Sequence, residues 1–359
     1  MLQRLHVRNY RSLRDVGIEL GQLTVVTGPN GSGKSNLYRA LELVQAAAAG
    51  RFAQALLGDG GMPSALWAGP RRKGPVRMGL TTRWDDLSHD IEAGLIQAGN
   101  NSPFVLDPEI KEEYIFVSPA RKPSTTLAER KGSHCKTVAV DGELRRTVSL
   151  VPSESLLSQV GEPDLYPEID TLARRVRGWR FYHQFDTGTA SAIRRPQPGV
   201  RTDALASDGH DLGAAIATLA ERGDRRALDD AVDQAFPGYA VNVGGEPGTF
   251  GVSLTAPGLQ RALSAQELSD GQLRFLCLAT ALLSTRPPEL LVLNEPETSL
   301  HPSAVVALAP LIKAAAQFSQ VWVTTHDASL RDSLADHAVV STLDVRNGAT
   351  HVTSDDPGH

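Results

Sequence analysis

One eight-residue segment limits the fold more than any other part of the sequence. Residues 28–35 read Gly-Pro-Asn-Gly-Ser-Gly-Lys-Ser and match the pattern G-x-x-x-x-G-K-[ST]. An apolar run at 23–27 precedes the segment, and a helical pattern at 34–49 follows it and ends before Gly50. In a strand–loop–helix of this kind, glycines let successive backbone N–H groups turn toward an anion at the helix N-terminus. The sequence therefore predicts an α/β fold with a phosphate-binding loop for a nucleotide.

The side chains of this loop have separate expected roles. Lys34 supplies a point charge for the β- and γ-phosphates, and the Ser35 hydroxyl is an expected ligand of Mg²⁺. The other loop residues expected to contact the nucleotide are Asn30, Gly31, Ser32, Gly33 and Asn36. The plain alternative is a glycine-rich turn that contains Lys-Ser by chance, but it leaves the flanking strand and helix unexplained. ATP and Mg²⁺ are the expected ligands.

Composition excludes several other classes of protein. The chain has 359 residues, 41% of them hydrophobic, which is enough for one large core or for a core and a smaller lobe. A net charge of −5 excludes a uniformly basic nucleic-acid coat, though not a local basic patch. The two cysteines, Cys135 and Cys277, have no metal-type spacing, so no disulfide scaffold is expected. Without a signal core or a membrane-length apolar run, we expect a cytoplasmic protein that does not contact a membrane.

Hydrophobic patterning divides the rest of the chain into three stretches. The first part is expected to contain a strand at 2–9 and an irregular Gly- and Pro-rich stretch at 51–75. The middle part is expected to contain antiparallel strands within 76–151, a helical stretch at 153–180, two helices within 209–235 and a hairpin at 240–255. From 264 onward the pattern predicts a helix at 270–285, a strand at 289–294, a helix at 302–317, a strand at 321–325, and then one more strand and a hairpin. We therefore expect one head formed by residues 1–75 and 263–359, separated in sequence by a mixed β/helical insertion at 76–262.

Three later segments resemble parts of ABC-type ATPase heads. Glu-Leu-Ser-Asp-Gly-Gln at 267–272 resembles the LSGGQ signature, with Asp270 in place of a glycine. The segments ELLVLNEPETSLH (289–301) and VWVTTHD (321–327) resemble the acidic Walker B strand and the switch-histidine region. Together with the opening VRNYRSLRDVGIELGQLTVVTGPNGSGKSNLYRAL, they resemble the RecF, SMC and OLD-like branch. The resemblance implies a P-loop NTPase fold with an ABC-ATPase-like head, a mixed sheet and an α+β insertion between the Walker A loop and the signature.

The resemblance also implies further nucleotide contacts. Arg11 and Ser12 correspond to residues that touch bound nucleotide in that branch, although a solvated turn is the alternative for them. Ser269, Gly271 and Gln272 correspond to residues that contact the nucleotide held by a second copy, so an ATP-dependent homodimer is implied. The alternative for this segment is an ordinary helix cap, because Ser and Asp are common at that position.

The expected catalytic residues are Lys34, Glu295 and His326. By the resemblance, Glu295 is the general base toward the attacking water, and His326 reaches the γ-phosphate and orients that water. Asn294 stands where the family has an Asp that supports Mg²⁺, and an amide brings no negative charge to the cation. Slow or partner-dependent hydrolysis is the hypothesis that follows. Gln184 is assigned to the family's glutamine loop, and Ser35, Asn294 and Gln184 are the expected metal ligands.

Basic clusters outside these motifs raise the question of nucleic-acid binding. They comprise Arg71, Arg72, Lys73 and Arg77; Arg145 and Arg146; Arg174, Arg175, Arg177 and Arg180, with Trp179, Phe181 and Tyr182; and Arg194 and Arg195. Such groups could neutralise phosphates along DNA, but charge runs are more often solvated faces. DNA therefore remains a candidate partner, and a salt titration of binding distinguishes the two interpretations.

Four functions from different classes compete. The leading interpretation is an ATPase whose ATP-driven dimerisation is a switch in DNA maintenance or phage defence. One alternative is a regulatory ATPase subunit of a complex with a separately encoded nuclease or toxin, and another is a head that binds ATP with negligible hydrolysis. The ATPase of a membrane transporter is disfavoured by the Asn-Tyr-Arg-Ser opening and the long insertion. Only about 30 residues follow Asp327, too few for the nuclease domain of OLD-like relatives, so no nuclease activity is expected.

Overall fold

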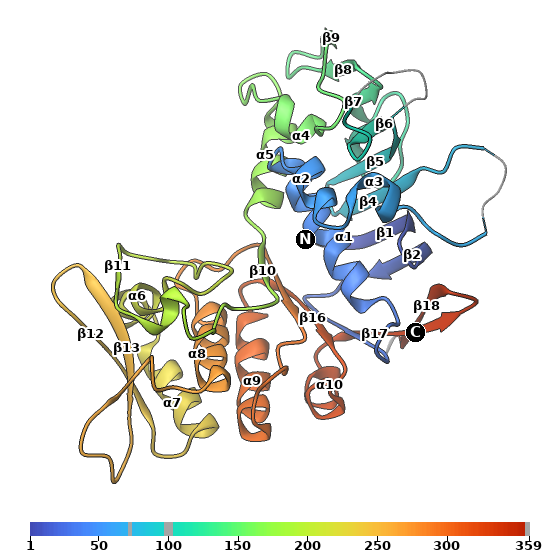
Figure 1. Cartoon of the computed structure of the whole chain (residues 1–359). Coiled ribbons are helices and arrows are strands. Elements are labelled where there is room, and N and C mark those ends of the chain that lie inside the picture. The colour runs from blue at the N-terminus through green and yellow to red at the C-terminus, as the bar shows by residue number, and fades with distance from the viewer. Residues whose placement is uncertain (71–73, 97–102, 356–359) are drawn as a thin grey trace. The chain divides into compact units, whose positions relative to one another are not determined.

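The computed structural model describes residues 1–70, 74–96 and 103–355, and the chain forms two compact units (Figure 1). Unit 1 consists of Met1–Gly21, Val26–Trp179 and Val339–His359. Unit 2 consists of Gln22–Val25 and Arg180–Ala338. Strand β3 (Leu23–Thr27), whose five residues are all buried, contains the boundary between Val25 of unit 2 and Val26 of unit 1.

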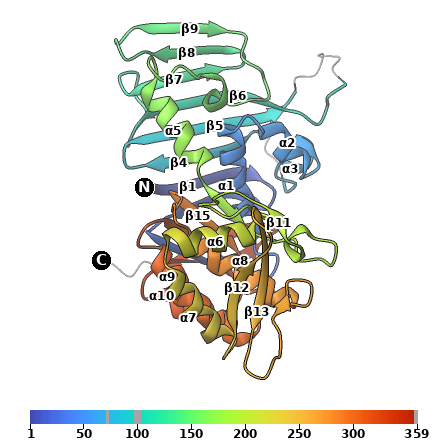
Figure 2. The same cartoon turned by 90° about the vertical axis from the view of Figure 1, so that its left-hand side faces the viewer.

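Unit 1 is built on an eight-stranded sheet in which all neighbouring strands are antiparallel (Figure 2). The strand order is β2-β1-β4-β5-β6-β7-β8-β9. The bounds are β1 (Leu2–Tyr10), β2 (Leu13–Glu19), β4 (Met78–Trp84), β5 (Leu87–Leu95), β6 (Pro108–Val117), β7 (Thr126–Lys131), β8 (His134–Val138) and β9 (Leu144–Val148). Leu5 and Val7 are buried while Arg8 is exposed, as period-two alternation requires. The predicted strand at 2–9 and the antiparallel strands within 76–151 are confirmed.

Helices of unit 1 pack beside this sheet. They are α1 (Lys34–Ala48), α2 (Phe52–Leu57), α3 (Gly61–Ala65), α4 (Leu156–Gln159) and α5 (Pro167–Arg177). Gln45 of α1 donates a hydrogen bond of 2.7 Å to the carbonyl oxygen of Trp179, just after α5. The prediction that 51–75 is irregular was wrong, since α2 and α3 lie there. These helices are too short to show a periodic pattern, and buried Phe52 and Met62 anchor them instead.

A C-terminal hairpin also belongs to unit 1. It consists of β17 (Val339–Arg346) and β18 (Ala349–Asp355), which pair in an antiparallel register. The N–H of Thr350 donates to the carbonyl oxygen of Ser12 at 2.9 Å, in the turn between β1 and β2. The end of the described chain therefore lies beside its beginning, and the predicted C-terminal hairpin is confirmed.

Unit 2 has a small parallel sheet with strand order β10-β15-β16. Its strands are β10 (Arg180–Tyr182), β15 (Leu290–Asn294) and β16 (Gln320–Thr325), and Val321 donates from its N–H to the carbonyl oxygen of Gln22 just before β3. The helices are α6 (Leu212–Arg222), α7 (Arg225–Ala235), α8 (Asp270–Leu282), α9 (Pro302–Ala315) and α10 (Ala328–Ala335). The remaining strands are β11 (Gln197–Pro198), β12 (Ala240–Gly244), β13 (Thr249–Thr255) and β14 (Leu263–Ser264). Because β15 and β16 are parallel, their carboxyl ends share one edge, where Asn294 lies opposite Thr324.

Most predicted elements of this unit are confirmed. The structure contains the two helices within 209–235, the hairpin at 240–255, and the helices and strands at 270–325. Helix α10 was not predicted: it follows β16 directly, and the side chain of Asp327 caps it by accepting from the N–H of Leu330 at 2.7 Å.

Candidate functional site

The predicted phosphate loop lies between β3 and α1. Gly31 and Gly33 have φ angles of 80° and 105°, a region that residues with a Cβ rarely adopt. Lys34 is the first residue of α1 and is only 3% exposed. Its Nζ donates hydrogen bonds to the carbonyl oxygens of Gly28 at 2.8 Å and Pro29 at 3.2 Å. The ammonium group of Lys34 therefore lies against the backbone at the start of the loop, and its hydrogen bonds join the two ends of the loop.

The N-terminus of α1 suits an anion. Within the described part of the chain, no side chain caps this helix and no acidic residue lies in its first turn. The helix dipole places a partial positive charge there, and Lys34 adds a full one. Asn30 and Ser35 are exposed at the rim of the loop, whereas Ser32 is buried. The loop therefore fits the phosphates of a nucleotide, with the Ser35 hydroxyl at the surface where a phosphate-bound Mg²⁺ takes an oxygen ligand.

Three further residues predicted to contact the nucleotide lie close to the loop within unit 1. Asn36 Nδ2 donates to Ser12 Oγ at 2.8 Å. The Arg11 guanidinium pairs with Asp59 at 2.6 Å, and the Asp59 side chain is 3% exposed. Burial, together with its hydrogen bond to Asp59, raises the pKa of Tyr10. Arg11 therefore balances the charge of a buried carboxylate. The sequence did not reveal this partner, because Asp59 lies between α2 and α3, each of which is shorter than two turns. The contact of Arg11 with nucleotide stays a prediction.

In unit 2 the predicted catalytic residues lie at the carboxyl edge of the parallel strands. Glu295 directly follows β15 with a φ of 48°, and its N–H donates to the carbonyl oxygen of Thr324 at 2.9 Å. His326 directly follows β16, and its Nδ1 lies 3.8 Å from Glu295 Oε1. Adjacent parallel strands thus bring together two residues that are 31 positions apart in the sequence.

Glu297 is a further member of this cluster that sequence reasoning left without a role. Its side chain is 5% exposed, and its Oε1 lies 3.3 Å from Nδ1 of His326. The same oxygen accepts hydrogen bonds from Thr325 Oγ1 at 2.6 Å and from the N–H of His326 at 3.0 Å. Glu297 therefore fixes both the backbone and the imidazole at the end of β16. The sequence offered one indication of this role, because Glu297 is the second acidic residue of the segment Asn-Glu-Pro-Glu at 294–297.

Asn294 has neighbours on both sides of its amide. Its Oδ1 accepts from Thr324 Oγ1 at 2.5 Å, and its Nδ2 lies 2.6 Å from Nδ1 of His183. An amide nitrogen only donates, so His183 accepts at Nδ1 and, when neutral, carries its proton on Nε2. Sequence reasoning singled out the neighbouring Gln184 but not His183, which follows the three-residue strand β10 and matches no motif.

Arg274 connects three segments of unit 2. It lies in α8 and is 8% exposed, and its Nη2 donates to the carbonyl oxygens of His183 at 3.2 Å and Glu295 at 3.0 Å. Burial lowers the pKa of this guanidinium, while the charges of Glu297 and Glu295 oppose that shift. An arginine remains charged under these conditions. Arg274 therefore ties the helix that starts at the signature to the loop that carries Glu295.

The signature segment forms the N-terminus of α8. Ser269 and Gln272 make a capping box: the N–H of Gln272 donates to Ser269 Oγ at 3.2 Å, and the N–H of Ser269 donates to Gln272 Oε1 at 3.0 Å. Asp270 pairs at 2.6 Å with buried Arg194, which also donates to the carbonyl oxygen of Leu268. The cap interpretation of this segment is therefore correct as a description of structure, and it leaves the proposed contact in trans untested.

The predicted metal ligands are divided between the units, with Ser35 in unit 1 and Asn294 and Gln184 in unit 2. Gln184 is exposed. Among the described residues, no group of three or more His, Cys, Asp or Glu side chains has the arrangement of a metal site. This donor set fits a Mg²⁺ ion that depends on phosphate oxygens rather than one held in a protein cage.

Several residues of the basic clusters meet acids of the same chain. The ion pairs are Arg77 with Glu92 and Glu112, Arg145 with Asp141, Arg174 with Asp170, Arg175 with Asp86, and Arg194 with Asp270. Arg71, Arg72 and Lys73 lie outside the described residues. Charges paired in this way give less attraction for nucleic acid than the sequence count suggests.

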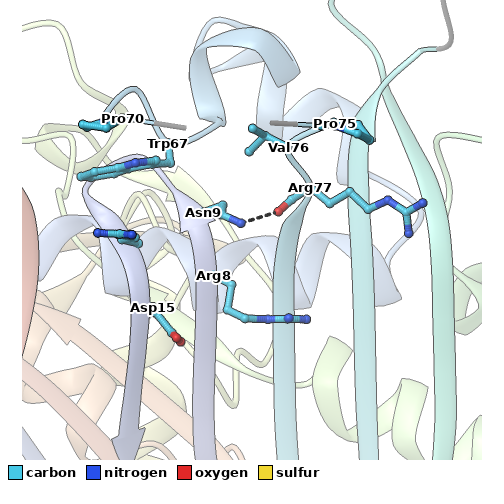
Figure 3. Close-up of a pocket in the computed structure, with 10 residues that line it drawn as sticks. Arg8, Asn9, Asp15, Trp67, Pro70, Pro75, Val76 and Arg77 are labelled. Atoms are coloured by element: carbon cyan, nitrogen blue, oxygen red, sulfur yellow. Dashed lines mark hydrogen bonds between the residues drawn. The ribbon is translucent and has the colours of Figure 1, made fainter. Parts of the chain in front are cut away.

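A surface pocket of about 350 Å³ in unit 1 includes Arg8 and Arg77 in its lining (Figure 3). Trp67 forms part of its wall, and Asn9 Nδ2 donates to the carbonyl oxygen of Arg77 at 2.9 Å. In Figure 3 the side chains of Arg8 and Arg77 extend away from Trp67. Both guanidinium groups pair with Glu92, at 2.8 Å and 3.3 Å. The positive charge of these two residues is therefore balanced within the sheet.

None of the helices in the described residues has the length and apolarity needed to cross a bilayer.

Comparison with known proteins gives matches along the chain. A family model described as "AAA ATPase domain" matches residues 1–145, and one described as "AAA domain, putative AbiEii toxin, Type IV TA system" matches residues 149–332, just over half of the chain. An OLD nuclease of Thermus scotoductus is 52% identical over 44 residues, which are 12% of this chain and 8% of that protein. A "Putative ABC transporter ATP-binding protein" of Streptomyces avermitilis is 37% identical over 102 residues, 28% of this chain and 18% of that protein. The chain thus matches only a small part of the length of either relative.

Solved structures show the same fold. An Smc head bound to the C-terminal winged-helix domain of ScpA is similar over 98% of this chain and 97% of its own, with a TM-score of 0.58 and 16% identity. An Smc head of Pyrococcus furiosus with an extended coiled coil, bound to the C-terminal domain of ScpA, is similar over 98% and 96%, with a TM-score of 0.56 and 15% identity. The predicted P-loop fold with an ABC-ATPase-like head is confirmed. The chain belongs to the family described as "AAA domain, putative AbiEii toxin, Type IV TA system", and its fold is similar to that of Smc heads.

Proposed function

We propose that this chain binds ATP with Mg²⁺ in its phosphate loop, hydrolyses it slowly, and uses ATP-dependent association of two copies as a switch. The observation that carries the proposal is the phosphate loop itself. Lys34 is buried against the carbonyl oxygens of the loop, at the start of a helix whose first turn holds no acid in the described chain. Membership of an AAA ATPase family supports the same ligand.

In this proposal each residue has a defined task. Lys34 neutralises the β- and γ-phosphates, and a Mg²⁺ ion held with the help of Ser35 would supply further charge neutralisation. Glu295 accepts a proton from the attacking water, and His326, held by Glu297, orients that water. Asn294 contributes no charge, so turnover is slower than in heads that carry an Asp there. The contacts of Arg274 with the Glu295 carbonyl and of Glu297 with His326 support this assignment because they fix both groups.

The switch depends on the signature segment. Ser269, Gly271 and Gln272 contact the γ-phosphate of a nucleotide held by the second copy, so each composite site needs both chains. The support is the ordered N-terminus of α8, where a capping box fixes the backbone and the helix dipole favours an anion. ATP then stabilises the dimer, and hydrolysis releases it.

The test is the size of the protein in solution with and without ATP-Mg²⁺, measured by light scattering during gel filtration. The Glu295→Gln variant should form a dimer with ATP-Mg²⁺, because it binds ATP without consuming it. Lys34→Ala should remain a monomer under the same conditions, and Glu289→Gln, at the exposed residue directly before β15, should behave as wild type. A Glu295→Gln protein that binds ATP but is a monomer in every condition would remove the switch and leave a nucleotide-binding head.

A second candidate function is a regulatory ATPase subunit that acts on a separately encoded toxin or nuclease. The description of the family names a toxin of a type IV toxin–antitoxin system, and one relative is an OLD nuclease. Roles in phage defence or DNA maintenance are consistent with either candidate, and DNA stays a candidate partner. A phosphate-release assay on the purified chain, with Glu295→Gln as background, separates the candidates. Turnover that appears only when an effector protein is added supports the regulatory subunit, and none in any condition supports a binding-only head.

A further inference from the structure

Three side chains and one carbonyl from distant parts of unit 1 form a continuous chain of hydrogen bonds beside the phosphate loop. Asn36 Nδ2 in α1 donates to Ser12 Oγ at 2.8 Å, and Ser12 Oγ lies 2.8 Å from Thr350 Oγ1 in β18. Thr350 Oγ1 donates to the carbonyl oxygen of Ser32, inside the loop, at 2.9 Å. Ser12 and Thr350 are 338 positions apart in the sequence. We call these residues the loop tie.

Donor and acceptor chemistry fixes the direction of the loop tie. A carbonyl oxygen only accepts, so the single hydroxyl proton of Thr350 goes to Ser32. Thr350 therefore accepts the proton of Ser12, and Ser12 accepts from the amide nitrogen of Asn36, which only donates. Each hydroxyl both donates and accepts, and Thr350 is 3% exposed. Loss of the Thr350 hydroxyl therefore removes both the donor to the buried Ser32 carbonyl and the acceptor of the Ser12 proton.

Packing joins the same hairpin to the loop at two places. A Cβ on Gly33 would lie 2.3 Å from Thr350 Oγ1 and 3.0 Å from Ser12 Oγ. A Cβ on Gly28 would lie 2.5 Å from the carbonyl oxygen of Leu343 in β17. The hairpin β17–β18 is thus in close contact with both the first and the last glycine of the loop.

We propose that Thr350 is a positioning residue for the nucleotide site, and that the C-terminal hairpin holds the phosphate loop in its binding conformation through the loop tie. The proposal rests on the proposed function, since it assumes that the loop binds ATP. It assigns a role in that site to a residue 23 positions beyond the last motif residue, Asp327. The affinity for nucleotide then depends on the β17–β18 hairpin, which contacts the loop through Thr350 and Leu343.

The experiment compares Thr350→Val with Thr350→Ser. Valine keeps the shape of the side chain and removes the hydroxyl, whereas serine keeps the hydroxyl. Two quantities are measured: the dissociation constant of ATP-Mg²⁺ by titration calorimetry, and amide hydrogen exchange of residues 28–36 in the nucleotide-free protein. Thr350→Val should weaken ATP binding about tenfold and speed exchange in 28–36, because the buried Ser32 carbonyl and the Ser12 hydroxyl each lose a hydrogen bond. Thr350→Ser should restore both quantities close to wild type.

Matched controls keep the outcome clear. Thr342→Val, at an exposed position of β17, should change neither quantity. Ser12→Ala cuts the same chain of bonds elsewhere, and the double variant Ser12→Ala/Thr350→Val should lose little more than either single variant. Should Thr350→Val not fold, exchange of residues 28–36 in nucleotide-free Ser12→Ala carries the test, because Ser12 is itself expected to contact the nucleotide. Wild-type exchange and affinity in both single variants would overturn the proposal. If the wild-type protein does not bind ATP, the proposed function is overturned. If Thr350→Val still speeds amide exchange in residues 28–36 of that protein, the positioning role of Thr350 remains.

Discussion

Asn294 stands where the resemblance to ABC-type heads implies an Asp, and the structure shows how its amide is held. Thr324 donates to its oxygen and His183 accepts from its nitrogen, so both polar atoms have defined partners. The amide is therefore fixed in orientation at the edge of β15, close to the backbone of Glu295. In the proposed mechanism, a neutral side chain at this place would attract a divalent cation less than a carboxylate would.

Replacing Asn294 by Asp should raise the steady-state rate of ATP hydrolysis by about tenfold, because a carboxylate adds a negative charge for Mg²⁺. The fold should tolerate the change: Thr324 can still donate, and His183 can move its proton to Nδ1 and donate to the new oxygen. The measurement is phosphate release at saturating ATP-Mg²⁺. Asn242→Asp, at an exposed position of β12, serves as the control. A fall in turnover on Asn294→Asp would sink the hypothesis that the amide slows hydrolysis.

At this scale the sequence was informative where a residue belongs to a motif. Glu295 and His326 lie together as their places after two successive strands predict, and Lys34 closes the loop. His183, Arg274 and Thr350 carry no local pattern, and each acquires its contacts only when remote segments fold together. Glu297 is an intermediate case, because its position was visible but its partners were not.

The start of helix α8 combines two requirements in a few residues. Ser269 and Gln272 cap the helix, and Gly271 lies so close to the loop after Glu295 that a Cβ there would be 2.7 Å from the carbonyl oxygen of Ser299. A backbone atom cannot move aside as a flexible side chain can. The glycine therefore sets the approach of α8 to this loop, whatever it contacts in a dimer.

Gly271→Ala should destabilise unit 2 even though alanine favours helices. The helix propensity gain is about 1 kcal/mol at most, whereas forcing a methyl group against a packed backbone costs about 1–3 kcal/mol. The net effect should be a loss of about 1 kcal/mol, seen as a lower midpoint in urea unfolding followed by circular dichroism. Gly161→Ala, where a Cβ meets nothing within 4 Å, should shift the midpoint very little. A midpoint unchanged in Gly271→Ala would contradict the close approach.

Among the elements, the apolar strands and the long amphipathic helices were predicted, whereas the short helices were not. Strand β15 and helix α9 are continuous apolar or amphipathic stretches, so their pattern alone identifies them. Helices α2, α3 and α10 have eight residues or fewer, and burial of Phe52, Met62 and Leu330 holds them in place. The boundaries at residues 75 and 262 between head and insertion stay a prediction.

On the scale of the whole molecule, each of the two units contains one of the two cysteines. Cys135 lies in β8 of unit 1, where burial raises the pKa of its thiol to about 12. Cys277 lies in α8 of unit 2, where complete burial also raises the thiol pKa. The thiolate is the reactive form, so both raised pKa values and low exposure protect these side chains from alkylation.

Native protein at pH 8 should therefore react with iodoacetamide at neither cysteine, and protein in urea should react at both. Peptide mass spectrometry over a series of urea concentrations should report the opening of unit 1 from Cys135 and of unit 2 from Cys277. ATP-Mg²⁺ should slow labelling of Cys135, because the phosphate loop that binds it is part of unit 1. Lys34→Ala is the control in which ATP gives no protection. Rapid labelling of either cysteine in the native protein would contradict the burial described above.

The hydrogen bond between Ser12 and Thr350 joins residues 338 positions apart, and it therefore cannot form until nearly the whole chain has been synthesised. A ribosome that adds about 5–20 residues per second makes Thr350 roughly 15–60 s after it makes the phosphate loop. During this interval the nascent chain carries the loop without the hairpin that contacts it. A chain halted by a premature stop codon before Thr350 lacks the same contacts permanently. Such fragments should compete poorly for cellular ATP and should not enter dimers with intact copies.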